Sequence, residues 1–464
     1  MRRPSSWVAR VTSGQLLGQD NPITASVVTD SRLAEAGSLY VARRGESADG
    51  HDFVPSAVEN GAVAVLVEHP IDGLPAGVAQ IVVSDATDAL GMLARAYLRE
   101  LRRGDLSVIG ITGSAGKTTT KDLVARLLSA QAPTVASIRS FNNEVGVPLT
   151  ILRADEDTRF LVLEMGASAL GHLRYLASIA PLDVAVELMV GTAHLGGFGS
   201  QAGIAQAKQE LVEGLVDGGS AVLNADDHLV MAMAEVSPGL VFTFSQYSDR
   251  HANVYADQVH IDQDDRAHFL LHIGDQAEQV DLHLVGAHHI HNALAAASVG
   301  HLLGVPITDI ASIMSRATAD SPHRMDVSVQ TLAGHSITLI DDSYNANQDS
   351  MMASLAAARR IAGSGRVVAV LGEMLELGEA SSQIHQRVGQ AAADNQVATI
   401  IGLGAGARDY AHGIGAENVV LAGSVDEAIT VLKDTVDHGD VVLVKGSNGS
   451  QAWKVADTVR GAQA

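Results

Sequence analysis

The sequence contains no cysteine, and this absence excludes several kinds of chemistry at once. Disulfide bonds, thiolate catalysis and zinc or iron–sulfur sites built on cysteine are all ruled out. Aromatic residues make up only 3% of the 464 residues, whereas 47% are hydrophobic, 18% are charged and 45 are glycine. This composition is that of a folded globular protein rather than a disordered one.

Basic residues are scarce as well. The chain has 31 Lys and Arg against 53 Asp and Glu, which gives a net charge of −22. A nucleic-acid partner or an anionic membrane surface would need a basic footprint, so neither partner is expected. Residues 1–7 lack the apolar run of a signal peptide, and no stretch of about 18 apolar residues could span a bilayer. We therefore expect a cytoplasmic protein.

Length and patterning divide the chain into three parts. At about 150 residues per domain, three domains are expected. The first part, residues 1–104, has short apolar runs at 62–67 and 80–83 and helical spacing over 86–103. This combination is typical of a small mixed α/β domain.

From residue 105, apolar runs of strand length alternate with helical segments. Short, mainly apolar runs are typical of a parallel sheet covered on both faces, and they lie at 106–112, 160–163, 183–186 and 220–223. Residues 252–285 alternate instead like hairpin strands, and a helix is expected over 290–303. Further strand-length runs lie at 336–340, 366–371, 399–403 and 440–444. The expected fold is α/β with three domains: 1–104, a central mainly parallel sheet over 105–323, and a Rossmann-like domain over 324–464.

The most specific motif is GITGSAGKTTTK at residues 110–121. A buried strand leads into glycines and then into a helix that begins at Lys117, so backbone N–H groups and the positive helix end would face a polyphosphate. Lys117 would reach the terminal phosphates, and the Thr118 hydroxyl would hold Mg²⁺. Ile111 stands where the strict motif spacing has glycine, and a purely structural turn is the alternative. The motif predicts a nucleoside triphosphate site formed by Gly113, Ser114, Ala115, Gly116, Lys117, Thr118 and Thr119.

An acidic residue follows the next buried run. Glu164 ends the segment Leu161-Val-Leu-Glu164. A carboxylate at the carboxyl end of a strand beside the phosphate loop is where a Mg²⁺ ligand is needed, although a solvated strand end would show the same pattern. We expect Glu164 to bind the metal.

With these features the sequence resembles the Mur ligase family over nearly its whole length. In the first part the resemblance rests on TDSR (29–32), GSLYVA (37–42) and RGESADGH (44–51). In the middle it rests on the phosphate loop, NNEVGVP (142–148), EMGA (164–167), AH (193–194) and AK (207–208). In the last part it rests on DDSYNAN (341–347), LGEMLELG (371–378) and KGS (445–447). The DDSYNAN string marks the subtype that adds D-alanyl-D-alanine to a UDP-linked tripeptide.

The resemblance implies an ATP-dependent amide ligase of cytoplasmic peptidoglycan precursor synthesis. The substrate UDP-N-acetylmuramoyl-tripeptide would be converted to an acyl phosphate and then attacked by D-alanyl-D-alanine. The three domains would bind the UDP substrate, ATP, and the dipeptide with ATP, in that order along the chain. Two Mg²⁺ ions, a carbamylated lysine and a monomer are implied, with small molecules as the only partners.

The resemblance also implies roles for individual residues. Lys208, carbamylated by CO₂, would bind metal together with His194, Glu164 and Thr118. Arg324 would reach the γ-phosphate, and Lys117, Lys208, His194 and Arg324 would form the catalytic set. Asn292 would contact adenine and Asp342 the ribose. The substrate contacts would be Ser31, Arg32, Arg44 and Gly45 for the UDP end, Asn142 and Asn143 for the sugar–peptide portion, and Lys445 and Ser447 for the dipeptide.

Three positions depart from the family pattern, and other functions remain open. His289, Gln348 and Asn448 stand where the family usually has asparagine, proline and arginine. A ligase of the same mechanism with another amine acceptor, such as a different Mur ligase or a folylpolyglutamate synthase, is the nearest alternative. Folate-type relatives lack the motifs of residues 1–104, which counts against them. A P-loop regulator that hydrolyses nucleotide is the alternative from another class.

Overall fold

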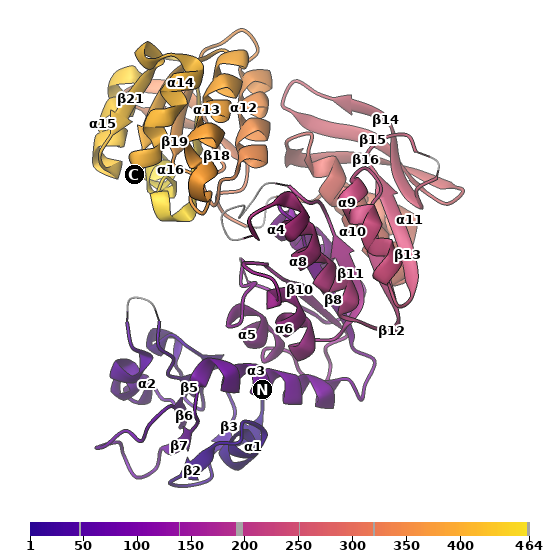
Figure 1. The fold of residues 1–464 in the computed structure, drawn as a ribbon, viewed down its shortest axis with the longest axis vertical. Helices are drawn as coiled ribbons and strands as arrows, with labels where there is room; N and C mark the ends of the chain where they lie inside the picture. Colours follow the sequence, from indigo (N-terminus) through magenta and orange to yellow (C-terminus); the bar gives the residue numbers. More distant parts are fainter. Residues whose placement is uncertain (46–47, 139, 192–197, 250, 319–320, 462–464) are drawn as a thin grey trace.

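The computed structural model describes residues 1–45, 48–138, 140–191, 198–249, 251–318 and 321–461. These residues form three large sheets, of five, nine and six strands, and one two-stranded sheet. Figure 1 shows the three large sheets in three bodies that follow one another along the molecule, with the N-terminal and C-terminal bodies at opposite ends. The expected α/β fold is confirmed, and no helix of the described residues is long and apolar enough to cross a bilayer.

The N-terminal body is built on a five-stranded sheet in the order β2-β7-β6-β5-β4, parallel except for β2. Asp85 caps the longest helix of this body, and its carboxylate accepts hydrogen bonds from the N–H groups of Thr87 and Asp88. The Tyr97 hydroxyl on the same helix donates to the Ala154 carbonyl oxygen at 2.9 Å, which ties the body to the next one. Its elements are β1 (Arg3–Pro4), α1 (Ser5–Val11), β2 (Gln15–Leu17), β3 (Pro22–Ile23), β4 (Val27–Val28), β5 (Leu39–Val41), α2 (Val54–Glu59), β6 (Ala64–Val67), β7 (Ala79–Val82) and α3 (Ala86–Leu101).

The central body contains the nine-stranded sheet, in the order β16-β15-β14-β13-β12-β11-β8-β10-β9. Strands β9 to β14 and β8 are parallel, and β15 and β16 are antiparallel, as expected for residues 252–285. Its elements are β8 (Ser107–Thr112), α4 (Lys117–Ser129), β9 (Thr134–Ala136), α5 (Gly146–Ile151), β10 (Phe160–Glu164), α6 (His172–Ile179), β11 (Leu182–Glu187), α8 (Gln201–Glu213), β12 (Leu215–Asn224), α9 (His228–Met231), β13 (Leu240–Ser245), β14 (Val254–Ile261), β15 (Arg266–Ile273), β16 (Gln276–Val285), α10 (His289–Leu302) and α11 (Ile307–Ser315).

The strand order of this sheet determines where a ligand-binding crevice can form. After β8 the chain builds β9 and β10 on one side of β8, and then β11 and the later strands on the other. In open parallel sheets such a reversal leaves a crevice at the carboxyl ends of the strands, where ligands bind. The phosphate loop follows β8 directly, and Glu164 ends β10, so both lie at this crevice.

The C-terminal body has a six-stranded sheet in the order β17-β18-β22-β19-β20-β21, parallel except for β17. Arg360 of its first helix bonds Asp265 of the central body, from Nε to Oδ1 at 2.5 Å and from Nη2 to Oδ2 at 3.0 Å. Its elements are β17 (Asp326–Leu332), β18 (His335–Asp341), α12 (Gln348–Ala362), β19 (Val367–Gly372), α13 (Ser381–Asp394), β20 (Val397–Leu403), α14 (Ala411–Ile414), β21 (Val419–Ala422), α15 (Val425–Thr435), β22 (Val441–Lys445) and α16 (Trp453–Gly461).

Close backbone packing in the C-terminal body gives a first prediction. A Cβ atom on Gly389 of α13 would lie 2.1 Å from the Tyr410 carbonyl oxygen, which as a backbone atom cannot yield easily. Gly389→Ala should therefore lower the free energy of unfolding by about 2 kcal/mol or more, measured by urea denaturation. Gly461→Ala is the control, because a Cβ there meets nothing within 4 Å. Equal stability of the two variants would contradict the packing argument.

Candidate active site

The phosphate loop adopts the conformation that the motif predicts. Helix α4 begins at Lys117 after Gly116, whose φ of +82° lies in the left-handed region. A Cβ atom on Gly116 would lie 2.3 Å from Asn292 Oδ1, so only glycine fits between the loop and α10. The first-turn N–H groups of α4 have no partner inside the helix, which leaves them for an anion. Lys117 Nζ folds back and donates to the Gly113 carbonyl oxygen at 2.7 Å.

Ser114 is held from two sides. Its N–H donates to the Met189 carbonyl oxygen at 2.9 Å, and its hydroxyl accepts from Gly191 N–H at 2.8 Å. From the C-terminal body, Asn347 Nδ2 donates to the Ser114 carbonyl oxygen at 3.4 Å. These contacts fix the loop against the segment after β11 and against the start of α12.

The Thr118 hydroxyl is the centre of the site. It donates to Glu164 Oε2 at 2.8 Å and accepts from Arg324 Nη2 at 2.9 Å. Ser140 Oγ lies 3.1 Å from the same hydroxyl and 3.3 Å from Arg324 Nη2. The other Glu164 oxygen, Oε1, accepts from Asn142 Nδ2 at 2.7 Å. Side chains from α4, β10 and the start of the C-terminal body thus meet at one oxygen atom.

Arg324 is further fixed by an aromatic ring. Its guanidinium carbon lies 4.1 Å from the centroid of the Tyr344 ring, which is within the range of a cation–π contact. Neither Ser140 nor Tyr344 was expected in the site from sequence. Ser140 precedes the asparagine pair by two residues, and Tyr344 lies inside the DDSYNAN string, so both were close to recognised motifs.

Lys208 lies in the same crevice, with a second buried acid beside it. Its Nζ atom is 3.4 Å from Thr112 Oγ1 and 3.8 Å from Glu187 Oε1. Burial lowers the pKa of Lys208, and the neighbouring Lys117 lowers it further, whereas Glu187 opposes this shift. Burial also raises the pKa of Glu187, against the effect of the two lysines. Glu187 was not among the residues expected from sequence, although it ends a buried strand as Glu164 does.

Asn292 and His289 form one unit on helix α10. Asn292 Nδ2 lies 3.1 Å from His289 Nδ1, and Thr120 Oγ1 donates to Asn292 Oδ1 at 3.4 Å. Burial and the adjacent His288 hold the pKa of His289 well below its ordinary value, so the ring is neutral and Nδ1 can accept from the amide. His289, which stands where the family usually has asparagine, therefore still provides a hydrogen-bond partner for Asn292.

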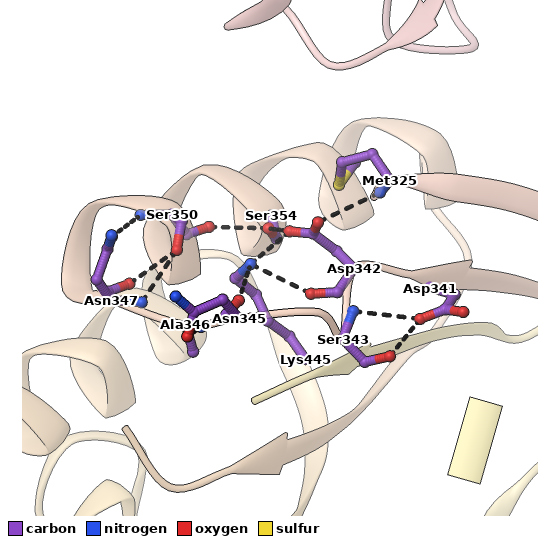
Figure 2. A network of polar contacts seen from close by, with 10 residues as sticks. All are labelled: Met325, Asp341, Asp342, Ser343, Asn345, Ala346, Asn347, Ser350, Ser354 and Lys445. Atoms are coloured by element: carbon purple, nitrogen blue, oxygen red, sulfur yellow. Dashed lines mark hydrogen bonds and ion pairs between the residues drawn. The ribbon is translucent and has the colours of Figure 1, made fainter. Parts of the chain in front are cut away.

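Asp342 is the centre of a network in the C-terminal body, shown in Figure 2. Its Oδ1 accepts from Met325 N–H at 3.2 Å, and its Oδ2 accepts from Ser354 Oγ at 2.7 Å and from Lys445 Nζ at 2.5 Å. Lys445 is buried and also donates to the Asn345 carbonyl oxygen at 3.1 Å. In this arrangement Asp342 and Lys445 bind each other, so ligand contact by either would require this pair to rearrange.

The candidate UDP contacts lie in the N-terminal body, apart from the phosphate loop (Figure 1). Ser31 is buried, and Arg32 is paired with Asp30 at 2.6 Å. The Arg44 side chain lies 3.2 Å from Glu68, and Gly45 N–H donates to the Ala48 carbonyl oxygen.

The remaining candidates are held by structural contacts or lie outside the described residues. Asn143 Oδ1 accepts from Gly146 N–H at 3.0 Å and so supports the start of α5. Ser447 Oγ accepts from Leu375 N–H at 3.0 Å. His194 lies outside the described residues.

His291 on helix α10 gives a prediction on pH. Burial lowers the pKa of His291 to about 4, although the nearby Asp226 and Asp227 oppose this shift. Below about pH 6.5, His291 binds a proton in the unfolded chain but stays neutral in the folded chain. The free energy of unfolding should therefore fall as the pH is lowered from about 6.5 to 4. His291→Gln should remove on the order of 2 kcal/mol of this fall, measured by urea denaturation at several pH values. Parallel profiles for the two proteins would contradict the assignment.

Comparison with known proteins agrees with this geometry. Three family models match the chain: "Mur ligase family, catalytic domain" over residues 24–98, "Mur ligase middle domain" over 111–300, and "Mur ligase, glutamate ligase domain" over 323–448. A curated relative from Mycobacterium tuberculosis, named UDP-N-acetylmuramoyl-tripeptide--D-alanyl-D-alanine ligase, is 40% identical and covers 94% of this chain and 92% of its own.

Solved structures show the same likeness. A crystal structure of MurF from Acinetobacter baumannii is 31% identical, with a TM-score of 0.86 over 99% of each chain. The MurF ligase of Thermotoga maritima in complex with ADP is 28% identical, with a TM-score of 0.77 over 95% of this chain and 98% of its own. The agreement of motifs, site geometry and likeness along the whole chain places this protein in the Mur ligase family.

Proposed function

We propose that the protein joins D-alanyl-D-alanine to UDP-N-acetylmuramoyl-tripeptide with the hydrolysis of ATP to ADP and phosphate. The observation that carries this proposal is the 40% identity over 94% of the chain to relatives named for that reaction. The reaction proceeds by two bond exchanges. A carboxylate oxygen of the tripeptide forms a bond to the γ-phosphorus as ADP leaves. The dipeptide amine then forms the C–N bond as phosphate leaves with the bonding electrons and the amine loses a proton.

The first exchange brings two anions together, so this chain must supply positive charge. The N-terminal turn of α4 and the Lys117 ammonium group, which here bonds the Gly113 carbonyl oxygen of the loop, would face the phosphates, and Arg324 comes from the start of the C-terminal body. Arg324 already lies on the Thr118 hydroxyl, held by the Tyr344 ring. Preorganised cations of this kind stabilise the charge that develops on a transferred phosphoryl group. We assign the catalytic contact with the γ-phosphate to Lys117 and Arg324.

The residues around Thr118 fit a magnesium ion. The Thr118 hydroxyl and the Glu164 carboxylate are buried oxygen ligands of the type that Mg²⁺ prefers, and they lie 2.8 Å apart. Bound there, Mg²⁺ supplies positive charge to the phosphate oxygens. Asn142 holds the second oxygen of Glu164 and so fixes the direction of the carboxylate. Glu164 and Thr118 are therefore the proposed metal ligands, together with His194 and Lys208.

Lys208 fits a carbamate. CO₂ adds only to a neutral amine, and burial with Lys117 nearby lowers the pKa of Lys208, which increases the neutral fraction. A carbamate on Nζ has two oxygens and one negative charge, so it converts a lysine into a metal ligand. The Lys208 side chain is buried in the crevice that also contains Glu164 and Thr118. This crevice lies at the carboxyl ends of the neighbouring strands β10, β8 and β11.

A small hollow beside α4 marks where we place the nucleoside end of ATP. The hollow adjoins the phosphate loop at Thr119, and Arg324, which contacts Thr118, is part of its lining. Its lining includes Thr119, Asp122, Leu123, Leu284, His289 and Arg324. We assign adenine and ribose to this side of the crevice, with Asn292 behind His289. The N-terminal body would bind the UDP end, and the C-terminal body would bring the dipeptide.

The amine acceptor decides between the proposed reaction and its alternatives. Phosphate release should require ATP, Mg²⁺, the UDP-linked tripeptide and D-alanyl-D-alanine together, and omission of any one should reduce the rate at least 100-fold. A coupled phosphate assay measures this dependence, and a screen of other dipeptides and single amino acids is its control. Equal release without dipeptide would indicate a nucleotide-hydrolysing regulator, and preference for another amine would indicate a different ligase.

Lys208 gives the second test of this proposal. Lys208→Ala should lower kcat at least 100-fold, because the carbamate oxygens are lost, and added acetate or formate should restore part of the activity. Lys208→Arg is the matched control, because arginine keeps the charge but cannot form a carbamate and leaves no room for an added carboxylate. Full activity in either variant would contradict a metal-binding role of Lys208.

A further inference from the structure

Glu187 is a buried carboxylate for which the proposed reaction gives no role. It is fully buried at the end of β11, and neither of its oxygens has a hydrogen-bond donor among the described residues. Glu164, which lies opposite Ile111 at the end of β10, has donors for both oxygens. An unsatisfied buried carboxylate costs folding free energy, so its presence indicates a function that the resting contacts do not show.

The position of Glu187 is fixed by the sheet. In the parallel pair β11–β8, Glu187 lies opposite Thr112, the last residue before the phosphate loop. Helix α8 brings the Lys208 side chain to these two residues, with Nζ 3.4 Å from Thr112 Oγ1 and 3.8 Å from Glu187 Oε1. The lysine nitrogen is therefore held between one hydroxyl and one carboxylate, and both come from adjacent strands. A shift of less than about 1 Å in the lysine side chain brings Nζ to hydrogen-bond distance from Glu187.

We propose that Glu187 is a positioning residue for Lys208, whose carboxylate accepts the hydrogen bond of Nζ–H and so sets the direction of the carbamate. The inference rests on the proposed carbamylation of Lys208 and adds the group that orients it. Glu187 acts through Lys208 and contacts neither ATP nor the peptide substrates.

The chemistry of the modification supports this assignment. The lone pair of the neutral Nζ forms a bond to the carbon of CO₂, one C=O electron pair moves to oxygen, and one N–H proton leaves to water. The product keeps a single N–H group and is planar at nitrogen. When that N–H points to Glu187, the carbamate plane is fixed and its oxygens point away from Glu187. The negative charges of the two groups repel each other, and the nearby Lys117 ammonium group offsets this repulsion, because it interacts with both residues.

The test measures the carbamate directly, independently of activity. The purified protein is equilibrated with ¹³C-labelled bicarbonate and Mg²⁺, and the carbamate carbon is quantified by ¹³C NMR, with Lys208→Arg identifying the Lys208 signal. Glu187→Gln keeps an oxygen acceptor without the charge, and it should retain at least half of the wild-type signal. Glu187→Leu removes the acceptor, and it should reduce the signal at least fivefold. In assays, Glu187→Leu should lower kcat with KM for ATP changed less than twofold, and Glu187→Gln should recover most of kcat.

Three outcomes would overturn the inference. A Glu187→Leu signal equal to or above that of the wild type would show that Glu187 only pairs with the lysine ammonium ion and opposes carbamylation. Equal loss in Glu187→Gln and Glu187→Leu would show that charge, not hydrogen bonding, is what matters. Absence of a Lys208 signal in the wild type would reject the carbamate itself, and with it the proposed role of Lys208. The second result leaves the proposed carbamylation intact, so the two failures are distinguishable.

Matched controls separate positioning from folding. Glu210→Gln changes another buried glutamate of the same region, which accepts from Gly171 N–H at 2.7 Å and supports α6 away from Lys208. It should leave the carbamate signal at the wild-type level. If Glu187→Leu fails to fold, Glu187→Met provides a flexible apolar side chain of similar length, and the same fivefold loss is expected.

Discussion

The site depends on a local excess of positive charge at one edge of a sheet, in a chain whose net charge is −22. The N-terminal turn of α4, Lys117 and Arg324 converge where β8 ends, and the crevice between β10 and β11 provides the space. Without these groups, anionic ATP and an anionic substrate would be repelled by the surrounding acids. The sheet order is what makes this possible, because only a reversal at β8 leaves room above the strand ends.

Buried carboxylates in the same crevice orient the cationic side chains through hydrogen bonds. Glu164 accepts from Thr118, and Thr118 accepts from Arg324, so a carboxylate of the central body orients a guanidinium that belongs to the C-terminal body. The segment that carries Arg324 is strained, since its neighbours His323 and Met325 have φ values of +61° and +50°. Such values cost energy for non-glycine residues, and here hydrogen bonds from the C-terminal body hold them: His323 contacts Asp341, and Met325 N–H donates to Asp342. The connection between the two bodies therefore directly contacts the phosphate loop, through Arg324 and Thr118.

The fold was predictable from sequence where burial alone determines an element. Strands β10 and β22 were expected within a residue or two of their bounds, because all their side chains except the last, Glu164 and Lys445, are apolar and both faces are covered. Strand β17 was not expected, since it is an edge strand in which apolar and polar residues alternate and only Leu332 is buried. The phosphate loop was recognised because its spacing encodes a backbone conformation, whereas the domain boundaries at 104 and 323 stay predictions.

The site was predictable only in part, and Glu187 and Lys445 show why. Glu187 and Lys208 are 21 positions apart in sequence, and only the packing of α8 beside β11 and β8 brings them together. Likewise, the sequence gives no sign that Lys445 is buried against Asp342, because the pair joins the ends of two adjacent strands, β18 and β22. A buried pair of opposite charges stabilises little by itself, since desolvation offsets much of the attraction. What such pairs provide is a single defined geometry: Glu187 lies beside Lys208 in the crevice at β8, and Asp342 holds Lys445 at the strand ends of the C-terminal sheet.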